Sequence, residues 1–290
     1  MINNIQAHRS FQRLRDLEPQ SLFAMDTYAY LLFSGGGSEM ELGSLASTLL
    51  EIDKGFSQGW AAAALYCDRR GDPERALAFI DNAIRLSPQS SMCYRLKGLL
   101  LLGSGATEQA VVCFRQANGV RFEPDNYAGL VRALLDLGHV KEARISALEA
   151  VDGAPKSSLA HTLLGKVLEK SQRLSDCLHS YTRALSLNSA NIPCALSMAD
   201  VLIALDRKEE AVQILQATVH HAGASPSLRL ALGKAYHSLG RFGEALEQLQ
   251  MCIRSKNCSP NELVEAQAEV EKAESALGLS ESDAYSLNHR

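Results

Sequence analysis

The sequence contains no run of eighteen apolar residues, so no segment is expected to cross a bilayer as a helix. Its net charge is only −4 over 290 residues, a balance that gives no general attraction to nucleic acid or to an anionic membrane. The first six residues include neither a basic segment nor an apolar one, so secretion is not expected. These absences argue against nucleic-acid and membrane partners.

The seven cysteines are odd in number, and no two of them have the C-x-x-C spacing. Cys67, Cys113, Cys177 and Cys252 fall at predicted helix positions that face neighbouring helices. We therefore expect reduced cysteines that pack as small apolar residues, as is typical of a cytosolic or nuclear protein.

Residue patterns that carry chemistry are also missing. The glycine-rich segments at 35–37 and 103–105 do not lead into the Lys-Ser/Thr of a phosphate-binding loop. His220 and His221 have no histidine or carboxylate at the helical spacing that would complete a metal site. No Ser-His-Asp arrangement or carboxylate pair can be localised. We therefore expect no catalysis, no metal and no cofactor.

What the sequence does contain is a repeat of about 34 residues. One residue of each repeat serves as a reference position, and we call these seven residues the marker column. Small residues recur five positions after and seven positions before it. A fixed period of this length, with small residues at fixed phases, is typical of tetratricopeptide repeats. We predict an all-α fold, a superhelical solenoid of helix-turn-helix hairpins. The marker column is Gly37, Gly71, Gly105, Gly138, Gln172, Asp206 and Gly240.

Each recurring position has a physical reason. The two helices of a hairpin approach closely at two positions, and a larger residue there would overpack the contact at about 1–3 kcal/mol. Glycine in the marker column relieves the turn between the helices. We expect the hairpin contacts to be made by Trp60, Ala64, Ala76, Gly98, Ala110, Ala143, Gly165, Gly233 and Ala245.

The repeat divides the chain into four parts. Residues 1–22 are predicted to be a partial repeat, in which 7–18 form the second helix of a hairpin without its first helix. Seven repeats follow over 23–259, then a capping helix over 260–278 and a flexible tail over 279–290. Ser225-Pro226 and Ser259-Pro260 predict helix starts, the second with a capping box to Glu262. A chain that begins in mid-repeat is expected to be a fragment or to have its exposed apolar face covered.

A row of basic residues is the candidate binding feature. The first helices of the repeats line the inner face of such solenoids. One position of these helices is occupied by Arg132, Lys166 and Lys234, and Arg95 lies at a nearby position. We call these four residues the basic row, and we predict that it could hold an acidic or carboxylate-ended peptide. Asp200 interrupts it, and the alternative is that exposed first-helix positions simply carry charge. Asparagine never occurs at this phase, so a carboxylate-clamp co-chaperone is not expected.

Beyond the repeat, the chain resembles subunit seven of the anaphase-promoting complex, or cyclosome. The resemblance is carried by Leu17-Glu18-Pro19 and by Met25-Asp26-Thr27-Tyr28-Ala29-Tyr30-Leu31-Leu32, where Asp26 replaces the usual large aromatic. Further matching segments are Trp60, Tyr94 with Lys97-Gly98-Leu99, Phe114-Arg115-Gln116-Ala117 and Tyr127-Ala128-Gly129-Leu130.

The resemblance implies a non-catalytic scaffold of this cell-cycle ubiquitin ligase, which stacks with the other tetratricopeptide subunits in the nucleus and cytoplasm. Family members also self-associate through N-terminal repeats. Those repeats are missing before Ala7, so a homodimer is expected only if an N-terminal half exists. The alternative hypothesis is a free-standing adaptor whose basic row binds acidic tails. A third, the repeat arm of a glycosyltransferase, would need a catalytic domain that these residues do not provide.

Overall fold

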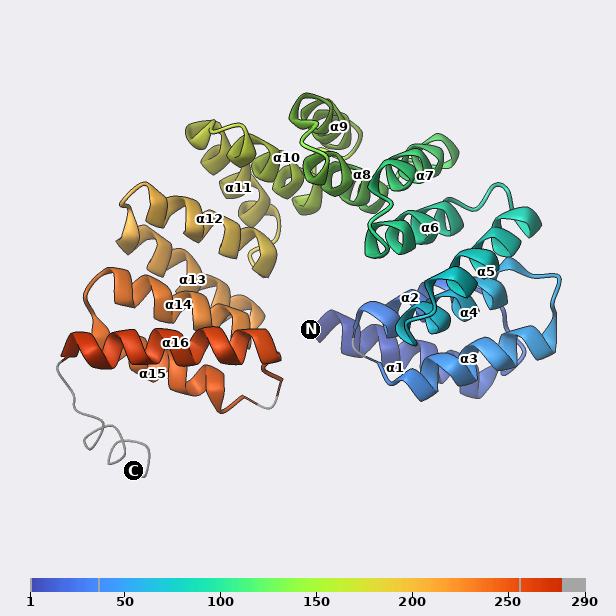
Figure 1. Cartoon of the computed structure of the whole chain (residues 1–290), viewed down its shortest axis with the longest axis horizontal. Coiled ribbons are helices and arrows are strands. Elements are labelled where there is room, and N and C mark those ends of the chain that lie inside the picture. The colour runs from blue at the N-terminus through green and yellow to red at the C-terminus, as the bar shows by residue number, and fades with distance from the viewer. Residues whose placement is uncertain (1, 36, 256, 278–290) are drawn as a thin grey trace. The chain divides into compact units, whose positions relative to one another are not determined.

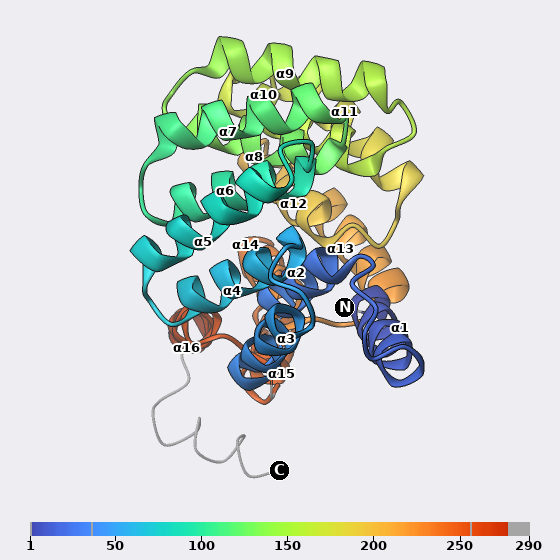
Figure 2. The ribbon, with the colours of Figure 1, turned by 90° about the vertical axis from the view of Figure 1, so that its right-hand side faces the viewer.

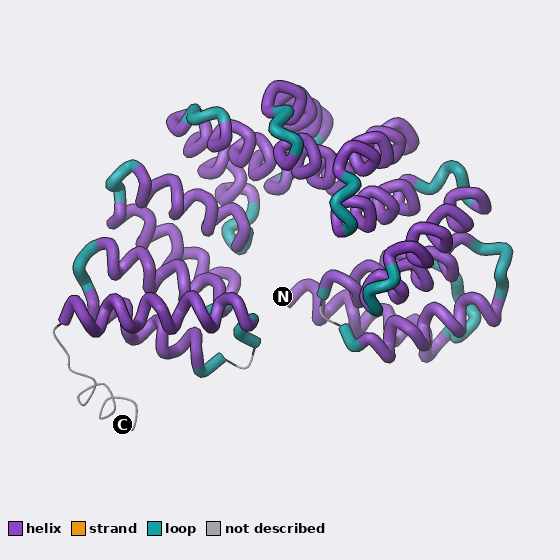
Figure 3. The backbone as a smooth tube through the Cα atoms, in the orientation of Figure 1, coloured by secondary structure: helices purple, strands orange, loops and turns teal. Residues whose placement is uncertain are grey.

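The computed structural model describes residues 2–35, 37–255 and 257–277, and within them it contains sixteen α-helices and no strand (Figures 1 and 3). The predicted all-α class is therefore confirmed. The chain divides into two compact units, Met1–Pro155 and Lys156–Arg290, which we call unit 1 and unit 2. None of the helices in the described residues is long and apolar enough to cross a membrane.

Unit 1 is built from helices that follow one another in antiparallel pairs joined by short turns. Figure 2 shows α5, α6 and α7 as successive layers. Each first helix packs against its own second helix, and α2, α4 and α6 also pack against the first helix of the next pair. The helices are α1 (Ile2–Leu17), α2 (Met25–Ser34), α3 (Glu39–Ile52), α4 (Ser57–Arg69), α5 (Pro73–Leu86), α6 (Ser91–Gly103), α7 (Thr107–Val120), α8 (Pro124–Asp136) and α9 (Val140–Gly153).

Unit 2 repeats the arrangement, and its last described helix lies alongside α14 and α15 (Figure 1). The helices are α10 (Ser158–Lys170), α11 (Leu174–Leu187), α12 (Ile192–Ala204), α13 (Lys208–Ala222), α14 (Pro226–Ser238), α15 (Phe242–Ile253) and α16 (Pro260–Leu277). The predicted tail over 279–290 lies outside the described residues. In unit 1, α1 begins five residues before the segment 7–18 predicted from the sequence.

The turn inside six of the hairpins depends on left-handed backbone at the marker column. Gly71, Gly105, Gly138 and Gly240 have φ between 74° and 81°. Gln172 and Asp206 occupy the same phase and are also left-handed, with φ of 57° and 60°. Glycine adopts this conformation without steric cost, whereas a residue with a Cβ is strained in it. The column therefore marks a backbone requirement that six of the repeats share.

The predicted helix starts are confirmed. Ser225 Oγ accepts a hydrogen bond from the Leu228 amide at 3.3 Å, and Pro226 opens α14. At α16 the Ser259 hydroxyl accepts from the Glu262 amide at 3.3 Å, while the Glu262 carboxylate accepts from the Ser259 amide at 2.9 Å. This reciprocal pair is the capping box, and it satisfies amides that the helix itself leaves unbonded.

Candidate binding surfaces

The small residues predicted to make the hairpin contacts are buried between paired helices. A Cβ built on Gly98 would lie 2.8 Å from the Phe114 ring, and one on Gly165 would lie 2.3 Å from the Tyr181 ring. Gly233 meets Leu249 in the same way, at 2.6 Å. Each glycine thus gives room for a large side chain from the second helix of its own hairpin. Five alanines of the set have no exposed surface: Ala64, Ala76, Ala110, Ala143 and Ala245.

Trp60 has a different role from these small residues. It is half-buried at the start of α4, where its ring lies 5.6 Å from that of Phe79 on α5. Its Nε1 donates a hydrogen bond to the Lys54 carbonyl at 2.9 Å, so the residue fixes both the hairpin and the loop that enters it.

Gly129 was missed by the sequence analysis, although it lies in close contact with the preceding hairpin of unit 1. It is on α8, and a Cβ added to it would lie 2.2 Å from the Phe114 ring on α7. The equivalent position of the three earlier repeats is occupied by Tyr28, Ala62 and Leu96, so no run of small residues marks it there.

In unit 1 the basic row is already engaged by carboxylates of the chain. Arg95 on α6 is only 13% exposed, and its Nη1 lies 3.0 Å from Oε2 of Glu123. Its guanidinium also stands 5.8 Å from the ring centroid of Tyr30, a cation–π distance. Arg132 on α8 is 70% exposed and lies 3.9 Å from the Asp136 carboxylate, one helical turn away.

In unit 2 the charges on the first helices alternate in sign. Lys234 on α14 binds Glu265 of α16 at 2.8 Å, and this hydrogen bond lowers the pKa of the Glu265 carboxyl. Asp200 on α12 is exposed as a whole residue, but partial removal of its carboxyl from solvent raises the pKa of that group, with a further contribution from Glu169 and an opposing one from Lys234. Lys166 has no carboxylate within ion-pair distance among the residues that the structure describes.

Over the described part of the chain, the basic row is therefore three ion pairs and one unpaired cation. A peptide carboxylate that reached Arg95 or Lys234 would have to replace Glu123 or Glu265, so it would exchange one ion pair for another. Unit 2 has no net positive strip, because Asp200 on α12 lies between Lys166 on α10 and Lys234 on α14 in the helix order, and Glu169 is on the same helix as Lys166. Peptide binding by these residues stays a prediction.

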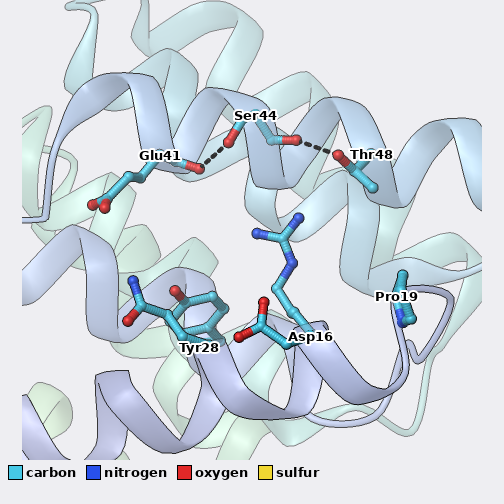
Figure 4. Close-up of a pocket in the computed structure, with 8 residues that line it drawn as sticks. Asp16, Pro19, Tyr28, Glu41, Ser44 and Thr48 are labelled. Carbon is cyan, nitrogen blue, oxygen red and sulfur yellow. Dashed lines mark hydrogen bonds between the residues drawn. The ribbon is translucent and has the colours of Figure 1, made fainter.

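A pocket of about 540 Å³ in unit 1 lies between α1, α2 and α3 (Figure 4). Arg15 stands in it with the carboxylates of Asp16 and Glu41. The Ser44 hydroxyl donates to the Glu41 carbonyl at 3.0 Å and Thr48 donates to the Ser44 carbonyl at 2.8 Å, so both protons are used by the helix backbone. The walls thus mix both signs of charge and present no activated nucleophile. The remaining lining residues are Gln12, Pro19 and Tyr28.

All seven cysteines are free thiols in the structure, and five of them are buried. Burial raises the pKa of the Cys177 thiol to about 12 and that of Cys194 to about 11, in the latter case against the opposing charge of Lys166. These thiols are therefore protonated and unreactive at neutral pH. Within the described residues there is no cluster of three metal-ligating side chains.

Comparison with known proteins agrees with this geometry. The family model described as "Tetratricopeptide repeat" matches residues 196–257. The chain is 28% identical over 258 residues to anaphase-promoting complex subunit 7 of Arabidopsis thaliana, covering 87% of this chain and 45% of that protein. It is 25% identical over 275 residues to subunit 7 of Homo sapiens, covering 91% of this chain and 47% of that protein. The resemblance found in the sequence is confirmed.

Among solved structures, a crystal structure of the anaphase-promoting complex hetero-tetramer Cut9-Hcn1 superposes with a TM-score of 0.65. The match covers 93% of this chain and 52% of that chain at 16% identity, so it concerns the fold. It supports the helix-turn-helix solenoid. The chain spans about half the length of the curated relatives it matches.

Proposed function

We propose that this tetratricopeptide-repeat chain, a relative of anaphase-promoting complex subunit 7, is a non-catalytic scaffold subunit of that ubiquitin ligase. It would bind other tetratricopeptide subunits of the complex, in the nucleus and cytoplasm. One observation carries the proposal: the similarity to subunit 7 proteins extends over 87–91% of the chain rather than over a few generic repeats.

The fold suits such a role. In a solenoid each hairpin buries its small residues against its neighbours, so the outer faces of the helices are left free along the whole length. The described residues form no cluster of three metal-ligating side chains, and the buried thiols of Cys177 and Cys194 are protonated. A protein of this construction acts through extended contact surfaces.

The adaptor hypothesis has less support, because Arg95, Arg132 and Lys234 already have carboxylate partners within the chain. Binding that depended on these cations would be weak and sensitive to salt, since ionic contacts at an exposed surface contribute little and are screened. Scaffold contacts between packed helix faces resist salt.

The test is affinity purification of the chain, tagged at its C-terminus, from the cells that express it, with mass spectrometry after a high-salt wash. Recovery of anaphase-promoting complex subunits in fixed proportion is the expected result. Recovery of scattered partners that the salt wash removes would contradict the scaffold proposal.

Two variants sharpen this experiment. The double change Arg132→Glu with Lys166→Glu reverses the two row charges that are most available, and recovery of the complex should not change. Gly129→Arg should destroy the packing of α8 on Phe114 and abolish recovery. The doubly substituted chain must show the same circular dichroism spectrum and melting temperature as the parent chain. If it then recovers no partner at all, the adaptor hypothesis replaces the scaffold proposal.

A further inference from the structure

Two thiols meet where α15 ends and α16 begins. Cys252 lies in the last turn of α15, and Cys258 immediately precedes Ser259, the capping residue of α16. Their sulfur atoms are 3.9 Å apart. The two residues are only six apart in sequence, but the helix end and the following turn bring them face to face. Neither the repeat nor the hairpin packing requires a thiol at both positions.

The surroundings of the two thiols differ. Cys252 has no exposed surface and packs in a cluster with Leu230, Leu249 and Ala266. Its Sγ donates to the Pro226 carbonyl at 3.3 Å, which ties α15 to the start of α14. Burial raises the pKa of Cys252 to about 12, and the neighbouring Cys258 contributes to the increase. Cys258 is only half-buried, so solvent reaches one thiol of the pair and not the other.

We propose that Cys252 and Cys258 are a site of oxidative modification, at which a hydroperoxide converts two thiols into an intramolecular disulfide that fastens α16 to α15. The accessible Cys258 reacts first. Its thiolate attacks the O–O bond, which breaks, giving the sulfenic acid of Cys258 and the alcohol of the peroxide, or water from hydrogen peroxide. The sulfur of Cys252 then attacks this sulfenic sulfur as its proton is lost, and the S–O bond breaks with release of water. In total, two thiols and one hydroperoxide give one disulfide, one alcohol and one water.

The geometry permits this step with movement on one side only. A disulfide bond is about 2.05 Å long, so the sulfurs must approach by roughly 1.9 Å from 3.9 Å. Cys252 is fixed within α15, whereas Cys258 lies in the connection between helices, where its amide donates to the Ser255 carbonyl at 3.2 Å. We therefore expect Cys258 to move toward Cys252 and the packing of α15 to be retained.

The disulfide would hold α16 more firmly against the helices on which it packs. This helix packs on α14 and α15, and it holds Glu265 against Lys234. A covalent tie at Cys258, two residues before the helix begins, would limit its local opening, because opening would then require the α15 end to unfold as well.

The experiment uses the purified, reduced full chain treated with hydrogen peroxide, alkylated in denaturant and digested with trypsin. The expected product is peptide 242–254 joined to peptide 257–272, two hydrogens lighter than their sum and separated again by dithiothreitol. The mass search includes oxidation of Met251. Cys67→Ser is the matched control, since Cys67 is also a half-buried free thiol, and it should leave the product unchanged. Cys258→Ser should abolish it.

Hydrogen exchange then tests the consequence. In the oxidised chain, amides of α16 should exchange about tenfold more slowly than in the reduced chain, and Cys258→Ser should show no change on oxidation. Three results would overturn the proposal: conversion of Cys258 to sulfinic or sulfonic acid without linkage, a link between two chains, or no reaction at peroxide concentrations that oxidise Met251.

Discussion

Replacing Gly129 by alanine should destabilise unit 1, because the Phe114 ring has no space to move into. An added Cβ would lie 2.2, 2.4 and 2.7 Å from three carbons of the ring. On the other side, the position of a Cβ on Gly98 is 2.8 Å from two carbons of the same ring. Ordinary contact begins at 3.4 Å, so the ring or α8 must shift by 3.4 − 2.2, or about 1.2 Å. Phe114 is fully buried between the two glycines, so the shift disturbs both hairpins.

Overpacking of this kind costs about 1–3 kcal/mol, and we expect the upper half of that range. Alanine gains about 0.5–1 kcal/mol over glycine within a helix, which leaves a net loss of roughly 1–2.5 kcal/mol. For a domain of this size such a loss lowers the melting temperature by about 2–4 °C for each kcal/mol. Gly119→Ala is the matched control, because Gly119 lies on α7 with no atom within 4 Å of its added Cβ. It should be neutral or slightly stabilising.

The assay is urea unfolding followed by helical circular dichroism, with hydrogen exchange to locate the change, since solenoids unfold in segments. Loss of protection should concentrate in α6, α7 and α8. Phe114→Leu in the same chain should reduce the cost of Gly129→Ala, and a double-mutant cycle measures this coupling. Equal effects of Gly129→Ala and Gly119→Ala would refute the close contact, as would strict additivity with Phe114→Leu.

Three further predictions concern single residues. Gly138→Ala should destabilise the chain by about 1 kcal/mol, because alanine is strained in the left-handed conformation, whereas Gln172→Gly should be stabilising. Shifts of the urea midpoint in the same direction for both variants would contradict this. Arg69→Ala should cost about 1.5–3 kcal/mol, because its guanidinium donates to two carbonyls in the last turn of α2 and to the Gly37 carbonyl beyond it. Its exposed neighbour is the control, and Arg70→Ala should be close to neutral in the same assay. The raised pKa of Asp200 means that the folded state keeps its proton to higher pH than the unfolded state, so stability falls as pH rises through the ordinary carboxyl range. Asp200→Asn should therefore be more stable than the parent at pH 7, with the difference disappearing in melts below about pH 4.

The fold could be predicted because each repeat imposes the same backbone requirement at the same phase. Gln172 and Asp206 show this most clearly: neither is glycine, yet each adopts the left-handed φ of its column. The sequence marks the phase through the other repeats, and tertiary packing then imposes the conformation on an unfavourable residue.

Contacts between residues that occupy different positions of the repeat could not be predicted in this way. Gly129 meets Phe114 across two hairpins, and neither the spacing nor the type of its neighbours in the column indicates a close approach. The thiol pair was missed for a related reason. Cys252 was recognised as a packed helix residue, but the position of Cys258 depends on how the chain turns into α16.

The basic row illustrates the same limit, with a functional consequence. Arg95 and Glu123 are 28 residues apart, and Lys234 and Glu265 are 31 apart, so each partner lies about one repeat away at another phase. Three of the four cations of the row therefore looked unpaired in the sequence but have carboxylate partners in the structure. Exposed ion pairs contribute about 0–1 kcal/mol each, and exchanging one carboxylate for another gains less. Micromolar binding requires about 8 kcal/mol, more than a few exposed ion pairs of this kind contribute. Under the scaffold proposal, we expect a tight partner to gain its affinity from apolar and hydrogen-bonded contact along the helix faces, and such contact to survive a high-salt wash.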